Sequence, residues 1–229
     1  MAVLALFDLD HTLLPFDSGM AWTRFLVGEG ALPAQAEADY LDHCHQYVAG
    51  TLDIHDMHRA SVAPLRHIKS TQLAQWLAAF ERQLAPRVPA ASLALVRQHH
   101  EAGHQCVLVT ATTRFIAEPC ARLFGIEQVL ATEAARDDSG LTGEILGLPC
   151  FREHKLTRVQ QWLAGRAPPV AGLAALDASW FYSDSAGDLP LLAAVSNPVA
   201  VNPDARLRAH ALAAGWPVLE PARAAAHQI

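Results

Sequence analysis

The sequence predicts an α/β fold in which a doubly wound parallel sheet carries an inserted helical domain. Short apolar runs alternate with amphipathic helical segments over most of the 229 residues, as in proteins that place helices on both faces of a parallel sheet. Each apolar run ends in polar residues, and one long helical stretch interrupts the alternation after the first run. These three observations define the fold class.

The apolar runs are the predicted strands. The first covers residues 3–7 and stops at Asp8, and the second ends at Thr110. Continuous apolar runs of this length suit strands that are covered on both faces. The third run ends at Asp184 and the fourth at residue 201. Helical patterns separate them, at about residues 90–102, 114–124, 153–164, 188–194 and 204–214.

Two segments depart from this alternation. Residues 16–86 show helical periodicity with few β-branched residues, and we interpret them as a helical cap domain. The core domain that carries the sheet would then comprise residues 1–15 and 87–229. Turn-forming residues at 137–140 lie between two short extended pieces, which predicts a β-hairpin there.

Composition narrows the class of partner and the compartment. The formal net charge is −6 and the basic residues are scattered, so neither a nucleic acid nor an anionic membrane is an expected partner. Apolar stretches fall far short of the ~20 residues that cross a bilayer, and no basic leader precedes the first aspartates. The four cysteines are widely spaced and are expected to be reduced. The sequence therefore predicts a cytoplasmic protein.

Carboxylates follow two of the predicted strands. Asp8 and Asp10 leave the first strand two residues apart, which is costly unless a cation or a proton offsets their repulsion. Asp184 and Asp188 follow the third strand. The ligand crevice of an open α/β sheet lies at these strand ends, so the four side chains should converge. A turn or a helix cap is the simpler alternative for each of them.

A hydroxyl and a lysine complete this set. Thr110 and Ala111 follow the second strand, where a hydroxyl and an N–H group can bind an anion at a helix N-terminus, or simply cap the helix. Lys155 falls at the start of a helix, where a cation needs an anionic partner; a solvated lysine is the alternative. Together these groups indicate a phosphate site, and oxygen-only ligands favour Mg²⁺.

In order along the chain, FDLDHT, VLVTAT, a downstream lysine and YSDSAGD resemble the four motifs of haloacid dehalogenase-like (HAD) phosphatases. The helical insertion after the first motif and the C-terminal pattern resemble the phosphoserine-phosphatase-like branch, subfamily IB. This resemblance covers essentially the whole chain. It implies a Rossmann-like core with a helical cap, and a Mg²⁺-dependent hydrolase acting on a small phosphorylated metabolite.

The resemblance also implies roles for the carboxylates. Asp8 would attack phosphorus and form an aspartyl phosphate, while Asp10 would protonate the leaving alcohol and then activate water. Mg²⁺ would be held by the Asp8 carboxylate, the Asp10 backbone carbonyl and Asp184.

Supporting roles fall to the other residues of the four motifs. Thr110, the Ala111 N–H group and Lys155 would bind phosphoryl oxygens. Asp188 would anchor Lys155 or a metal-bound water, and Thr12 would order the first loop.

Substrate choice is expected to lie with the cap. Asp17 stands where relatives that act on phosphoserine carry a glutamate for the substrate's amino group, although an N-cap is the alternative. Their carboxylate-binding arginine has no clear match, because Ser61 aligns there and Arg59 lies two residues away. An amino-alcohol phosphate such as histidinol phosphate is therefore favoured over phosphoserine. A phosphotransferase of the same superfamily remains an alternative.

Other readings fit less well. A carbon–halogen hydrolase needs no proton donor at the position of Asp10. A non-enzymatic phosphoaspartate switch has neither an aspartate equivalent to Asp10 nor a helical cap. Two positions depart from the family pattern: Gly187 stands where phosphoserine phosphatases carry Asn, and His154 stands where a glycine is common before the lysine.

The chain contains twelve histidines. The groups His43 with His45 and His55 with His58 do not favour a soft-metal site in the cap, because no further Cys/His pair at ligand spacing accompanies them. His99 and His100 are expected to form a solvated helix end.

Overall fold

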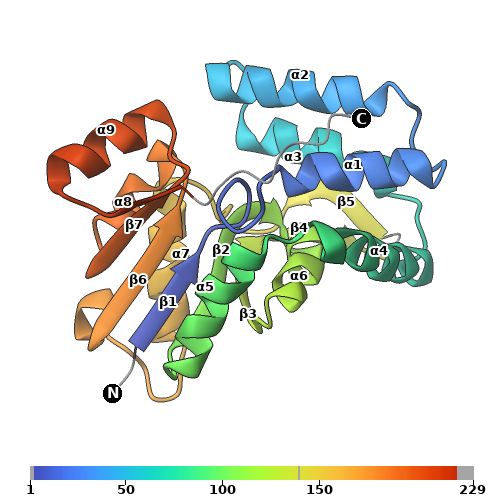
Figure 1. The fold of residues 1–229 in the computed structure, drawn as a ribbon. Coiled ribbons are helices and arrows are strands. Elements are labelled where there is room, and N and C mark those ends of the chain that lie inside the picture. The colour runs from blue at the N-terminus through green and yellow to red at the C-terminus, as the bar shows by residue number, and fades with distance from the viewer. Residues whose placement is uncertain (1–2, 139, 221–229) are drawn as a thin grey trace.

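A parallel sheet forms the centre of the molecule (Figure 1). The computed structural model describes residues 3–138 and 140–220. Within these residues the sheet has six strands in the order β3-β2-β1-β6-β7-β8, and each neighbouring pair is parallel. The strands are β1 (Val3–Phe7), β2 (Gln105–Thr113), β3 (Gln128–Thr132), β6 (Ala178–Ser183), β7 (Asn197–Val201) and β8 (Val218–Leu219). The predicted doubly wound α/β sheet is confirmed.

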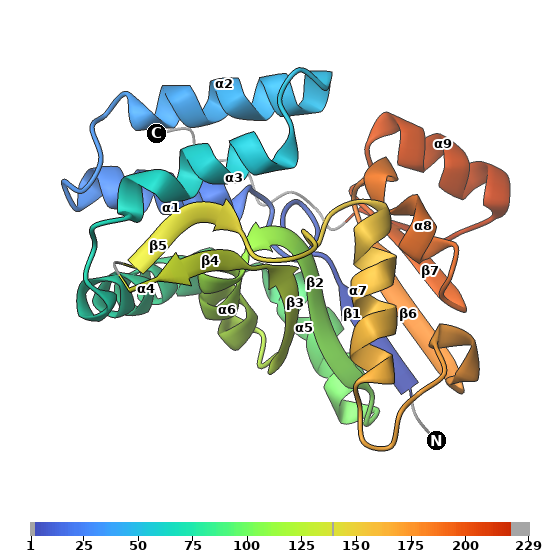
Figure 2. The ribbon, with the colours of Figure 1, turned by 180° about the vertical axis from the view of Figure 1, so that it is seen from behind.

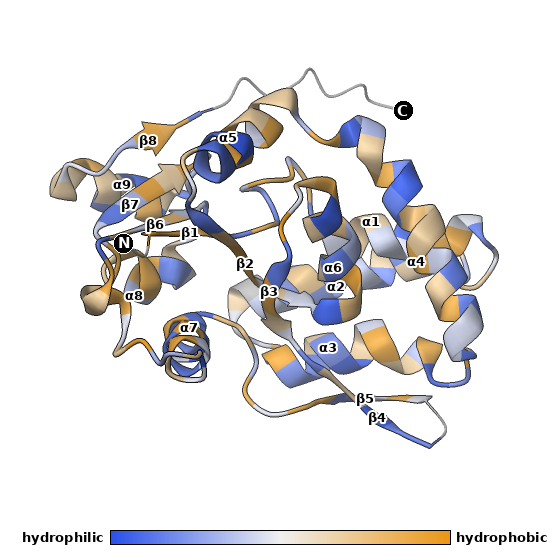
Figure 3. Cartoon of the chain, turned by 90° about the horizontal axis from the view of Figure 1, so that it is seen from below, coloured by the Kyte–Doolittle hydropathy of each residue, from blue (hydrophilic) through white to orange (hydrophobic). Residues whose placement is uncertain are grey.

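Both faces of the sheet are buried because helices cover each of them. Alternate residues of a strand face opposite sides: Ala5 and Phe7 of β1 join one apolar core, and Leu4 and Leu6 join another. The surrounding helices carry both apolar and polar residues (Figure 3), as amphipathic helices on a sheet require. The first core includes residues of α5 (Ala90–Glu101) and α6 (Arg114–Leu123), and the second includes residues of α7 (Glu153–Ala164), α8 (Leu189–Leu192) and α9 (Ala205–Ala214).

Four α-helices lie between β1 and α5 in the described chain, beyond the carboxyl ends of the strands (Figure 1). They are α1 (Ser18–Gly28), α2 (Ala36–Ala49), α3 (Ile54–Val62) and α4 (Ser70–Leu84). The Trp22 ring of α1 lies 5.1 Å from Phe80 of α4 and 6.2 Å from Phe115 of α6, centroid to centroid. Helices α1 and α4 therefore share the core of the sheet. The limits 16–86 for a separate cap domain stay a prediction.

A two-stranded antiparallel hairpin extends beside α3 (Figure 2). It consists of β4 (Ala134–Asp137) and β5 (Gly140–Ile145), as the turn-forming residues predict; Ser139 of that turn lies outside the described residues. Gly143 has φ +88°, and a Cβ there would lie 3.3 Å from Ala63. The hairpin can therefore approach the end of α3 closely only with glycine at this position.

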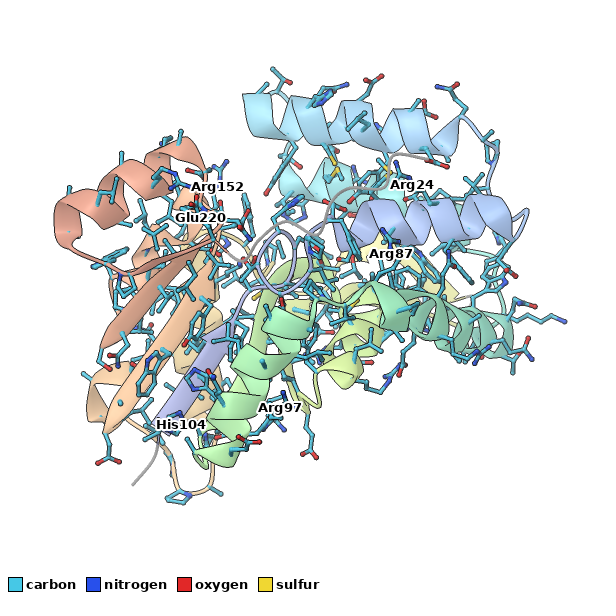
Figure 4. All side chains as sticks on the ribbon, viewed as in Figure 1. Arg24, Arg87, Arg97, His104, Arg152 and Glu220 are labelled. Atoms are coloured by element: carbon cyan, nitrogen blue, oxygen red, sulfur yellow. The ribbon has the colours of Figure 1, made fainter. Side chains whose placement is uncertain are left out.

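Two features differ from the sequence prediction. Strand β2 continues to Thr113 rather than ending at Thr110, because it pairs with Thr132 of β3 after a register shift. His99 is 7% exposed and not part of a solvated helix end. Its Nε2 lies 2.8 Å from the Tyr182 hydroxyl and its Nδ1 2.8 Å from Nδ1 of His104, at the end of the sheet away from the inserted helices (Figure 4). Burial, together with His104, lowers the pKa of His99 to about 4.

None of the helices in the described part of the chain combines the length and apolar character that crossing a membrane requires.

Candidate active site

The carboxyl ends of three neighbouring strands meet at one edge of the sheet. Strand β1 lies between β2 and β6, and the chain moves to opposite sides of β1 to form them, which creates the crevice typical of doubly wound sheets. Asp8 follows β1, Thr110 lies near the end of β2, and Asp184 follows β6. All three line a cavity of about 970 Å³.

A buried ionic cluster forms the floor of this cavity. Lys155 Nζ donates to Asp8 Oδ1 at 2.8 Å and to Asp188 Oδ2 at 2.7 Å, and the three residues are 4%, 7% and 3% exposed, respectively. Burial acts to lower the pKa of Lys155, but the carboxylates of Asp188 and Asp8 raise that pKa well above its ordinary value. Ser183 Oγ donates to Asp188 Oδ2 at 2.7 Å. The lysine therefore stays charged and is held between two anions.

Thr12 joins the carboxylates that follow β1 and β6. Its hydroxyl donates to Asp8 Oδ2 at 3.1 Å and lies 3.5 Å from Asp184 Oδ1. His11, immediately before it, has φ +60°, which turns the loop back over the strand end. Burial and then the charge of Asp8 raise the pKa of Asp184 to about 8. The two carboxyl groups thus resist being ionised together, and a hard divalent cation bound to their oxygens would relieve this repulsion.

Both oxygens of the Asp10 carboxyl accept hydrogen bonds. The Ser18 N–H group donates to Oδ1 at 2.7 Å and the Thr112 hydroxyl to Oδ2 at 2.7 Å, while Ser18 Oγ lies 3.1 Å from Thr112 Oγ1. Burial and then the charge of Asp17 raise the pKa of Asp10 to about 7. Sequence reasoning placed Ser18 and Thr112 in no role. Thr112 belongs to the second motif, but its hydroxyl faces Asp10 only because β2 continues as far as Thr113.

Ala111 also lines the cavity, beside Thr110. These two residues lie within β2, and α6 begins only at Arg114. The expectation that they sit at a helix N-terminus is therefore wrong: they lie within the C-terminal half of strand β2. The Thr110 hydroxyl accepts from the Thr112 N–H group at 3.2 Å.

The roof of the cavity comes from α1, α2 and α3. Asp17 is the N-cap of α1, and its Oδ1 accepts from the Met20 N–H group at 2.6 Å and from the Tyr40 hydroxyl of α2 at 2.9 Å. A Cβ on Gly19 would lie 2.1 Å from that hydroxyl oxygen, so the glycine permits the contact between the helices. The N-cap alternative for Asp17 is confirmed, and Asp17 also lines the cavity.

Arg59 requires a correction. Its side chain is 47% exposed and pairs with Asp56 at 2.7 Å and with Glu144 of β5 at 3.0 Å; it is not among the described residues that line the cavity. The face of α3 that lines the cavity includes Ser61, and Arg59 lies on another face because it is two residues away, about 200° around the helix. Arg59 therefore does not lie where the sequence predicted it, in contact with a substrate in this cavity.

Other cations line the cavity instead. Arg152 and Arg206 are both among its lining residues, and Arg152 lies between α9 and α2 in the view of Figure 4. The Arg152 guanidinium stacks over the Phe151 ring, 4.7 Å from its centroid. The Phe151 ring in turn packs against the Tyr47 ring of α2, with 5.2 Å between the two centroids. Neither arginine was singled out from the sequence, because no motif marks them.

Comparison with known proteins identifies the family. The model of the haloacid dehalogenase-like hydrolases matches residues 5–193. A histidinol-phosphatase of Neisseria meningitidis serogroup C (strain 8013) is 39% identical over 222 residues, which cover 96% of this chain and 99% of that protein.

Solved structures agree with this assignment. A protein of unknown function from Bordetella pertussis Tohama I is 41% identical, with a TM-score of 0.88 over 96% of this chain and 98% of the other. A substrate-bound phosphoserine phosphatase shares the fold at 15% identity, with a TM-score of 0.63 over 91% of this chain and 90% of the other. The strand-end carboxylates, the buried lysine and these similarities lead to one assignment: the chain belongs to the haloacid dehalogenase-like hydrolase family.

Proposed function

We propose that this hydrolase is a Mg²⁺-dependent phosphomonoesterase that forms an aspartyl phosphate on Asp8. The observation that carries the proposal is the buried contact of Lys155 with Asp8 and Asp188, with Asp184 and Asp10 beside it at the edge of one cavity. A cation next to a carboxylate at a strand end can hold a phosphoryl group against that carboxylate.

Two displacements follow from this arrangement. The Asp8 carboxylate attacks phosphorus, the bond from phosphorus to the ester oxygen breaks, and Asp10 donates a proton to the departing alkoxide. Water then attacks the phosphorus of the aspartyl phosphate and Asp10 accepts its proton. The bond from phosphorus to the Asp8 oxygen breaks, which regenerates the Asp8 carboxylate and releases inorganic phosphate. Lys155, the Thr110 hydroxyl and the Ala111 N–H group bind the phosphoryl oxygens in both steps.

Mg²⁺ fits the same site. The described residues contain no group of three or more His, Cys, Asp or Glu side chains placed to hold a metal. We therefore propose two carboxylates, Asp8 and Asp184, with the Asp10 backbone carbonyl, because Mg²⁺ keeps several waters and shares the oxygens of a substrate phosphate. When bound, the ion neutralises charge on the phosphoryl group during transfer.

For the substrate we propose the phosphate ester of an amino alcohol, with histidinol phosphate as the first candidate. The neisserial histidinol-phosphatase supports this choice, and so does an anionic residue, Asp17, in the roof of the cavity. Phosphoserine is the second candidate, since Arg152 and Arg206 line the cavity and a substrate carboxylate could pair with either of them. A phosphotransferase would use the same residues and differ only in the acceptor.

Metal removal tests the proposed class of reaction. EDTA is expected to abolish hydrolysis of p-nitrophenyl phosphate, and added Mg²⁺ to restore it, because hard oxygen ligands favour Mg²⁺ over Zn²⁺. Initial rates of p-nitrophenyl phosphate hydrolysis, measured after dialysis against EDTA and then against Mg²⁺ or Zn²⁺, test this expectation. Full activity in metal-free buffer would contradict the magnesium site. Release of inorganic phosphate without an added acceptor distinguishes hydrolysis from phosphoryl transfer.

Asp17→Asn tests the choice of substrate. A charge-assisted pair with a substrate ammonium contributes about 1.5–3 kcal/mol, so kcat/KM for histidinol phosphate is expected to fall roughly ten- to a hundredfold. Hydrolysis of p-nitrophenyl phosphate, which carries no amine, should scarcely change. Asparagine is itself a good N-cap, so the start of α1 is preserved.

Asp53→Asn is the matched control. Asp53 caps α3 through a 2.9 Å hydrogen bond from the Asp56 N–H group, and it is not among the described residues that line the cavity. The control should leave both substrates unaffected. Equal losses on both substrates in Asp17→Asn would show that Asp17 supports the site and does not select the amine. A preference of the wild type for phosphoserine would replace the first candidate with the second.

A further inference from the structure

We propose that Asp204, at the start of α9, is a positioning residue for Asp184. Asp204 belongs to none of the four motifs, and it lies twenty residues beyond Asp184 in the sequence. The inference rests on the proposed magnesium site and concerns how this chain holds one of its ligands.

The side chain of Asp204 bridges two segments of backbone. Its Oδ1 accepts from the Leu207 N–H group at 2.8 Å, as an N-cap of α9 does. Its Oδ2 accepts from the Ala186 N–H group at 2.7 Å, in the loop that follows β6. Helix capping needs only the first of these contacts. The second contact fixes the position of the loop relative to α9.

The backbone of Asp204 holds the same loop from a second point. The Asp204 N–H group donates to the Asp184 carbonyl oxygen at 2.8 Å. The peptide groups on either side of Ser185 are thus held by one residue. Within the loop, the Ser185 N–H group donates to Ser183 Oγ at 3.2 Å, and Ser185 Oγ accepts from the Gly187 N–H group at 3.1 Å.

The Asp184 carboxylate depends on this backbone support. Its contact with the Thr12 hydroxyl is 3.5 Å long, which holds a side chain only weakly. The direction of the carboxylate therefore follows from the backbone of residues 184–186, which Asp204 holds. Asn202, in the same connection from β7 to α9, also reaches the loop after β1, with Nδ2 3.5 Å from the His11 carbonyl oxygen.

Asp204→Asn separates the two functions of this carboxylate. The amide oxygen can still accept from the Leu207 N–H group, but the NH₂ group would then face the Ala186 N–H group, and two donors cannot pair. Helix α9 keeps its cap while the loop loses its support. Residues that support metal ligands in this way typically change metal affinity ten- to a hundredfold.

The test is calorimetric titration of the purified protein with Mg²⁺, which does not depend on turnover. We expect the Mg²⁺ dissociation constant of Asp204→Asn to rise about ten- to a hundredfold, with kcat at saturating Mg²⁺ close to that of the wild type. Asp204→Ser, which caps the helix but is too short to reach Ala186, should behave in the same way. Asp53→Asn should bind Mg²⁺ like the wild type.

Several outcomes would overturn the inference. An unchanged Mg²⁺ dissociation constant in either folded Asp204 variant would overturn the inference about Asp204. It would not contradict the proposed magnesium site. A comparable loss of affinity in Asp53→Asn would show a general effect of removing a charge at a helix cap. A loss that disappears in concentrated KCl would assign the effect to the charge of Asp204, because salt screens that charge and leaves the loop geometry unaltered. No Mg²⁺ binding by the wild type would overturn both the metal site and the inference.

Discussion

Asp8→Asn is expected to lower the rate of phosphate-ester hydrolysis by several powers of ten, because the amide cannot form the aspartyl phosphate. The protein should stay folded, since Lys155 keeps its 2.7 Å contact with Asp188. Initial rates on p-nitrophenyl phosphate, together with circular dichroism of the same preparation, measure the two effects separately.

A labelled phosphoryl group supplies the complementary measurement. The wild type, quenched in acid during turnover, should retain phosphate on the peptide that contains Asp8, and the Asp8→Asn protein should retain none. Appreciable turnover by a well-folded Asp8→Asn protein would exclude Asp8 as the nucleophile. Asp53→Asn again serves as the control, because it makes the same chemical change at an exposed helix cap.

Lys155→Met is expected to reduce both stability and activity. The lysine is 4% exposed and contacts two carboxylates that are themselves buried. Removing one partner of a buried ion pair typically costs about 3–5 kcal/mol, because the remaining charge is left unpaired. We expect a loss of this size in the free energy of unfolding measured in urea, and a drop in kcat/KM because the proposed contact with the phosphoryl group is lost.

Lys69→Met is the matched control for this change. Lys69 is exposed and precedes α4 without a side-chain cap, so the free energy of unfolding should change little. Adding Asp8→Asn to Lys155→Met should recover part of the lost stability, since it removes one of the unpaired charges. A Lys155→Met protein as stable as the wild type would contradict the buried cluster.

The polar ends of the strands could be predicted from the sequence because a parallel sheet brings the carboxyl ends of its strands to one edge. Asp8 and Asp184 directly follow the apolar runs that form β1 and β6, so their convergence follows from their positions along the chain. Thr110 lines the same cavity although β2 continues beyond it to Thr113. The order of the motifs predicted the family, which the comparisons confirm.

The roof of the cavity could not be predicted in the same way. It forms where separate helices meet, and the residues that line it depend on how each helix is rotated about its own axis. Arg59 and Ser61 are two residues apart, yet Arg59 pairs with Glu144 of the hairpin and Ser61 lines the cavity. The Tyr40 hydroxyl reaches Asp17 because Gly19 lets α1 and α2 approach, and nothing in the local sequence indicates that α2 lies there.

The sequence by itself determined the α/β class, the family and which carboxylates and lysine meet at the edge of the sheet, because these depend on strand ends and on short motifs. Only the tertiary structure decided what holds them: Ser18 and Thr112 on Asp10, and Asp204 on the loop of Asp184. Each of these contacts joins residues between eight and 102 positions apart. Such contacts arise from the packing of whole elements, which local propensity and periodicity do not specify.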